Sequence, residues 1–114
     1  APYPPPSFPY AYAPTTPKDP LVLSLFSNLE GGWAVEVQAE PLLAEGGKVI
    51  PPGQLEVRVN GGPWFPLGPK VVLLTGQGPS SGYQRHFLEL RLVLTGKEAP
   101  GVYRGVLVFS LSPL

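Results

Sequence analysis

The chain has 114 residues, which is enough for one domain and too few for two. Eight basic and eight acidic residues give a zero formal net charge, which argues against nucleic acid or an anionic membrane surface as a partner. The lack of Cys excludes a disulfide framework, and a single histidine excludes a His-rich metal site. No apolar run approaches the roughly 18–20 residues of a membrane helix, so no membrane span is expected.

The first 20 residues, APYPPPSFPYAYAPTTPKDP, differ in composition from the rest of the chain. Their prolines keep the segment extended, yet a plain linker would not carry large aromatic side chains. Residues 8–13 also alternate large and small side chains, which is the period of a strand. We therefore expect residues 1–20 to be an N-terminal extension and candidate donor strand, and residues 21–114 to be the folded domain. The residues predicted to bind a partner are the aromatics of the extension, Tyr3, Phe8, Tyr10 and Tyr12.

Beyond the extension, the sequence contains about seven runs with the alternation of a β-strand and none with helical periodicity. These runs span residues 21–26, 33–39, 55–60, 64–67, 71–75, 83–95 and 102–110. Asn60-Gly61-Gly62 predicts a hairpin turn, because Asn and Gly accept positive φ. Residues 40–54 are expected to be a long loop with at most one helical turn. The pattern predicts an all-β fold, an antiparallel Ig-like β-sandwich of about seven strands.

The same alternation assigns a face to each side chain. In the longest run, the leucines at even-numbered positions 88–94 are expected to face the core, with Glu89 and Arg91 pointing outward. In the last run, Leu107, Phe109 and Leu111 are expected to share one side.

Catalytic chemistry finds little support in the sequence. His86 lies at the start of a strand, and Asp19 is the only aspartate available to a catalytic triad. Glu36, Glu56 and Glu89 occupy outward positions on three strands, where two of them would resemble a glycosidase pair. Each has a basic or polar residue two positions away: Gln38, Arg58 and Arg91. Cross-strand charge pairing explains these carboxylates better, so we expect no catalytic residue, no metal and no cofactor.

Four aromatic residues of the domain are candidate platforms for stacking against a sugar, namely Trp33, Trp64, Phe65 and Tyr83. Trp33 is in phase with Val35 on its strand, which favours a place in the core. Trp64 follows the predicted hairpin and is expected to be a lid on the edge of the core or an exposed binding residue.

Three stretches carry a resemblance to secreted bacterial β-proteins: Ser27-Asn28 followed by WAVEV at 33–37, LEVRVNGGPW at 55–64, and APGVYRGVLVFSL at 99–111. The last resembles the C-terminal strand of pilus subunits such as the spore-coat-U-like pilins, and the first is similar to the corresponding strand of WxL-type surface domains. The resemblance implies an Ig-like fold, assembly by donor-strand exchange, and core positions for Trp33, Tyr103 and Phe109.

Together these features favour a non-enzymatic structural subunit of an extracellular filament or pilus. Its partners are identical subunits, reached by insertion of the N-terminal extension into a neighbour. Export through a cleaved signal peptide is expected, because the chain starts at Ala1 and contains no Met. Low Asn and Gln content and Pro-rich loops are typical of a thermophile. The alternatives are an extracellular carbohydrate- or surface-binding sandwich module, and a virion or cell-surface decoration protein.

Overall fold

The computed structural model describes residues 8–114 and confirms the all-β prediction. Tyr3, one of the predicted partner-binding residues, lies outside the described residues. The strands are β1 (Tyr10–Tyr12), β2 (Leu21–Leu25), β3 (Gly32–Ala39), β4 (Leu42–Ala44), β5 (Lys48–Ile50), β6 (Leu55–Val59), β7 (Phe65–Pro66), β8 (Val71–Gln77), β9 (Gln84–Leu94) and β10 (Leu107–Pro113). Two single 3₁₀ turns, η1 (Glu45–Gly47) and η2 (Pro52–Gln54), are the only helical elements among residues 8–114. Neither is long enough to cross a membrane.

The structure has ten strands where the sequence analysis expected about seven. The extension supplies β1, and residues 40–54, expected to be a loop, contain the hairpin β4–β5. The last strand begins at Leu107, later than the predicted residue 102, and continues to Pro113.

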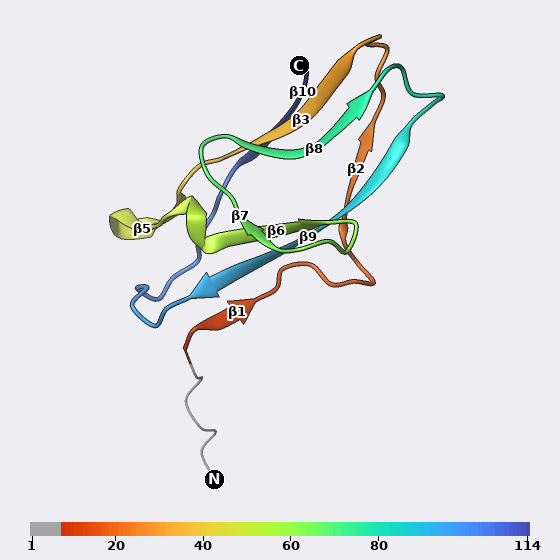
Figure 1. The fold of residues 1–114 in the computed structure, drawn as a ribbon. Helices are drawn as coiled ribbons and strands as arrows, with labels where there is room; N and C mark the ends of the chain where they lie inside the picture. Colours follow the sequence, from red (N-terminus) through yellow and green to blue (C-terminus); the bar gives the residue numbers. More distant parts are fainter. Residues whose placement is uncertain (1–7) are drawn as a thin grey trace.

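The strands form two main antiparallel sheets and one small hairpin (Figure 1). The first sheet has the order β1-β9-β6-β7, and β2 pairs with the same edge of β9 as β1. The second sheet has the order β10-β3-β8. The hairpin β4–β5 stands apart, held to the chain that precedes β10 by a backbone bridge between Leu43 and Arg104.

One core cluster takes side chains from both main sheets. β3 contributes Trp33, Val35, Val37 and Ala39, all at most 4% exposed, while β6 and β9 contribute Leu55, Val57, Leu88 and Leu90. The inward face predicted for β9 is confirmed at Leu88 and Leu90, and the other two leucines of that face are half-buried. Trp33 is in the core, as predicted, and its indole N–H donates to the carbonyl of Gly78 at 3.0 Å.

Candidate assembly interface

The described part of the extension lies on the first sheet of its own chain (Figure 1). Tyr10 pairs with Leu94 and Tyr12 with Leu92, so β1 runs antiparallel to the end of β9. The predicted aromatic residues nevertheless remain open to solvent: Phe8 is 49% exposed, Tyr10 47% and Tyr12 55%. The extension is therefore hydrogen-bonded as a strand while its rings stay largely uncovered.

Thr15 connects the extension to the sheet by its side chain, a role that the sequence analysis missed. β1 covers β9 from Leu92 onward and β2 covers it up to Leu88, which leaves Leu90 between them. The Thr15 hydroxyl accepts the N–H of Leu90 at 2.9 Å and lies 3.5 Å from its carbonyl oxygen. Thr15 is 9% exposed and takes the place of a backbone partner. Residues 10–25 thus form one interrupted edge strand along β9.

An exposed reverse turn joins the two halves of this edge strand. Thr16 and Asp19 exchange backbone hydrogen bonds of 3.3 and 3.0 Å, and Pro17 and Lys18 form the tip. All four residues are exposed, so the turn makes few contacts with the rest of the molecule. Pro17 occupies the second position of this turn, where its fixed φ matches a type I or II turn and favours the closed form.

An apolar groove follows the extension along the molecule. Beside Phe8 and Tyr12 it has a volume of about 480 Å³, and its floor includes Ile50 and Leu92. Tyr103 forms its far wall and donates its hydroxyl to the carbonyl of Ala99 at 2.6 Å. The resemblance implied a core position for Tyr103, but the side chain is half-buried on this wall.

A separate apolar depression of about 260 Å³ lies between the edges of the two main sheets, at β2 and β10. It is lined by Leu23 and Phe26 on one side and by Phe109 and Leu111 on the other. Phe109 is 36% exposed and Leu111 37%, so the core position expected for Phe109 is wrong in the single chain. Phe26 is 51% exposed. An apolar surface of this kind on both sides of a groove is typical of a protein–protein contact.

The outward charges of the first sheet are paired across strands. Glu56 lies opposite Arg91 and Arg58 opposite Glu89, each pair with a nitrogen–oxygen distance of 2.6 Å. Trp64 lies beneath both guanidinium groups, 4.9 and 4.3 Å from its ring centre. The prediction of charge pairing is confirmed for these two carboxylates. Since the arginines cover its ring, Trp64 is not a free platform for a sugar.

Glu36 and His86 also lie apart from any catalytic arrangement among residues 8–114. Glu36 is 3.6 Å from Lys70 on the second sheet, so it is paired with a residue that the sequence analysis had not named. The ring of His86 contacts the amide of Asn60 at 3.0 Å and that of Gln84 at 3.5 Å. The described residues contain no group of three or more His, Cys, Asp or Glu side chains positioned to hold a metal ion.

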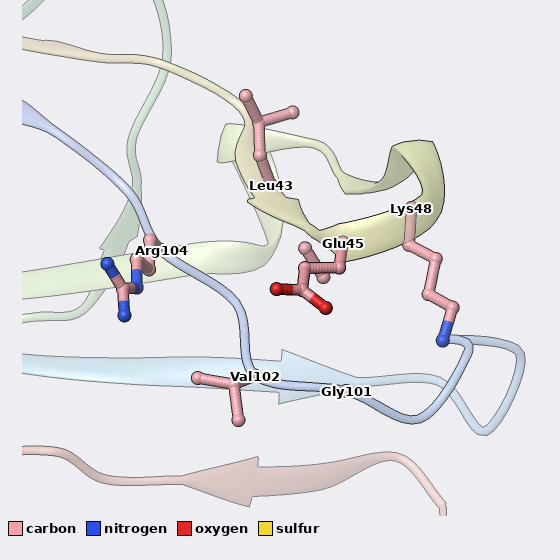
Figure 2. Close-up of a pocket in the computed structure, with 7 residues that line it drawn as sticks. Leu43, Glu45, Lys48, Gly101, Val102 and Arg104 are labelled. Carbon is pink, nitrogen blue, oxygen red and sulfur yellow. The ribbon is translucent and has the colours of Figure 1, made fainter.

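A larger depression lies elsewhere, between the β4–β5 hairpin and the segment before β10 (Figure 2). It is open to solvent, has a volume of about 730 Å³ and carries the charged side chains of Glu45, Lys48 and Arg104. The Lys48 ammonium donates to the carbonyl of Pro100 at 2.7 Å, which fixes the hairpin to the loop. All three charged residues are exposed to solvent.

A carboxylate also organises the turn after β9. Glu98 accepts the Thr95 hydroxyl at 2.7 Å, the backbone N–H groups of Thr95 and Gly96, and the Gln54 amide at 2.8 Å. These hydrogen bonds, that of Thr95 first, lower the pKa of Glu98 from 4.5 to about 2. Gln54 also donates to the carbonyl of Val93, so η2 and the end of β9 are held together beside the groove.

Comparisons of the chain with protein-family models, curated proteins and solved structures found no match.

Proposed function

We propose that this protein is a structural subunit of an extracellular filament or pilus, in which the N-terminal extension of one copy is inserted into the next. The acceptor is the edge of β9 beside Leu92 and Leu94, where β1 lies in the single chain. The observation that carries the proposal is the state of the extension. It is paired as a strand, yet its three aromatic rings are about half exposed. A neighbour's surface would cover these rings, which the chain's own domain does not.

The exposed connection between β1 and β2 permits exchange between copies. When the turn at residues 16–19 opens, the segment from Phe8 to Thr15 is released as a unit, and Thr15 can bond Leu90 of another copy as it does in its own chain. The hydrogen bonds formed with the neighbour are the same as those broken within the chain. The balance therefore depends on the additional surface buried between subunits.

The proposal includes a finer description of the fold. We infer that the two main sheets are the layers of an Ig-like β-sandwich, because one core cluster joins β3 to β6 and β9. In such a sandwich, edge strands are the places where a neighbour adds a strand by backbone hydrogen bonding.

Single cysteines test whether the extension exchanges, because the chain has none of its own. Ala11 pairs with Val93 in the β1–β9 ladder. The variants Ala11→Cys and Val93→Cys are unfolded together, refolded and oxidised mildly. We expect covalent heterodimers, since only an extension supplied by one chain to the other brings the two thiols together.

The matched control mixes Ala11→Cys with Ser81→Cys, whose thiol is exposed in the loop before β9, at the opposite end of that strand from Leu92 and Leu94. Equal cross-linking in both mixtures would contradict exchange. Deletion of residues 1–17 is the complementary test. The shortened chain is expected to fold and to lose the ability to form long assemblies, and a truncated chain that assembles as well as the full one rules out the donor role.

A second candidate function, carbohydrate binding, is favoured by one specific observation. Tyr83 is 78% exposed, and its ring lies 5.7 Å from that of Phe26 at an angle of 47°. Two exposed rings at one end of the first sheet are suited to contact a sugar. Affinity electrophoresis through gels containing polysaccharide tests this: Tyr83→Ala should abolish any retardation, and unretarded wild-type protein on all polysaccharides removes the candidate.

A further inference from the structure

We propose that the outer edge of β10 pairs with β10 of a second copy, antiparallel and centred on Ser110, to join two three-stranded sheets into one of six strands. Among residues 8–114, no strand pairs with this edge, because β10 is the end of the order β10-β3-β8. The contact is separate from the acceptor edge on β9, so it does not depend on the proposed function.

The hydrogen bonding of β10 shows which of its backbone groups are available. At one end of the ladder Leu114 donates its N–H to Gly32, and at the other end Val106 accepts that of Glu40. Bonded and non-bonded residues alternate along an antiparallel strand, and the register between β10 and β3 is continuous. Even-numbered residues of β10 therefore bond β3. The N–H and C=O groups of Leu107, Phe109 and Leu111 point to the free edge.

A two-fold axis at Ser110 matches these groups to one another. It places Phe109 opposite Leu111 of the second copy. The backbone N–H and C=O groups of both residues point to the free edge, so each such pair exchanges two hydrogen bonds, one pair on each side of the axis. Leu107 donates to the carbonyl of Pro113, and only the return bond is missing, because proline has no N–H. The whole length of β10 is used, and Pro113 marks the end of the ladder.

The side chains favour the same arrangement. Phe109 lies opposite Val37 and Leu111 opposite Val35 on β3. The side chains of Phe109 and Leu111 are therefore on the face of the sheet that is turned toward the core. In the pair, each Phe109 packs beside Leu111 of the partner and extends the apolar row over the groove next to β2. Residues 105–114 contain no charged side chain, so no like charges meet across the axis.

Two of the other sheet edges, those of β7 and β8, carry features that oppose such pairing. β7 has only two residues and ends in Pro66. β8 follows Lys70, and its ladder with β3 is interrupted by an irregularity between Val35 and Glu36. Bulges, prolines and lysines are the common means by which proteins protect sheet edges, and β10 has none before Pro113. A second copy of this chain is the partner that suits this edge. Two β10 strands have the same length and, in antiparallel orientation about Ser110, their free backbone donors and acceptors lie opposite one another.

A cysteine on the axis provides the decisive test. In the proposed pair, two Ser110 residues face each other at a non-hydrogen-bonded site, where Cα atoms lie about 4.5 Å apart, within the range that a disulfide bridges. The variant Ser110→Cys is expected to form a covalent dimer on mild oxidation at least tenfold faster than Val108→Cys. Val108 is on the same face and 47% exposed, but lies about 14 Å from its copy across the axis. Equal rates in the two variants would overturn the proposal.

Sedimentation velocity on the cysteine-free chain supplies the second readout. Wild-type protein is expected to show a concentration-dependent dimer, and Leu111→Pro a folded monomer, because this proline removes an N–H that the chain's own ladder does not use. A wild-type chain that is monomeric throughout the concentration range contradicts the proposal. After deletion of residues 1–17 the dimer should persist. If that deletion alone abolishes it, the β10 contact is wrong and the extension carries the association.

Discussion

β3 and β10 lie side by side in the same sheet, yet they bury very different fractions of their apolar side chains. Val35 and Val37 on β3 are 3% and 1% exposed, whereas Leu111 and Phe109, directly opposite them on the same face, are 37% and 36% exposed. The two strands have the same apolar alternation, so the difference comes from position alone. β3 is central and covered by the first sheet, while β10 ends the layer. The apolar face at this sheet edge is therefore partly uncovered in the single chain, as the proposed pairing of β10 requires.

The largest effect is expected in the covered core. Leu90 is 9% exposed and packs in the cluster that joins β9 to β3. Replacement Leu90→Ala leaves a cavity there, and we expect the free energy of unfolding to fall by about 2–5 kcal/mol. Chemical denaturation monitored by tryptophan fluorescence measures it. A loss below about 1 kcal/mol would mean that this part of the core collapses around the missing side chain.

The second effect concerns the close approach of β8 to β3. A Cβ at Gly76 would overlap the Trp33 ring. Gly76→Ala must therefore displace the indole, and we expect a cost of about 1–3 kcal/mol together with loss of its hydrogen bond to Gly78. Gly31→Ala is the control, since nothing lies within 4 Å of its Cβ position. A blue or red shift of tryptophan fluorescence in Gly76→Ala alone checks the displacement.

These two sites show what the sequence predicts and where it stops. The alternation around Leu90 and Trp33 predicts their faces correctly, and the Asn60-Gly61 turn has the expected positive φ angles of 51° and 74°. Periodicity is a local property, so it places Phe109 on one face with Leu107 and Leu111 but does not report whether anything covers that face. The core position that the resemblance implied is wrong because no other strand among residues 8–114 covers that end of the sheet. The bond from Thr15 to Leu90 depends on residues 75 positions apart, which no local pattern reports.

The β10 edge should respond more weakly than the core in the single chain. Because Phe109 is already 36% exposed, we expect Phe109→Ala to cost about 1–2 kcal/mol at low protein concentration, less than Leu90→Ala. The cost should grow with protein concentration if a second copy covers the ring, because binding stabilises the folded state by mass action. Thermal unfolding at two concentrations a hundredfold apart measures this. A cost equal to that of Leu90→Ala at both would place Phe109 in a fully covered core after all.

The smallest effect concerns the turn that follows β9, where order comes from hydrogen bonds to one carboxylate. The pKa of Glu98 is about 2 in the folded chain and 4.5 ordinarily, so the folded state favours the ionised form. The resulting stabilisation is complete above about pH 4.5 and is lost as the pH falls toward 2.

Carboxyl carbon shifts in an NMR titration should give a Glu98 midpoint near 2. Thr95→Val removes the hydroxyl that lowers this pKa most, and should raise the midpoint toward the ordinary value. If the Glu98 midpoint is the same with and without the Thr95 hydroxyl, the turn is held by its backbone and not by this side-chain bond.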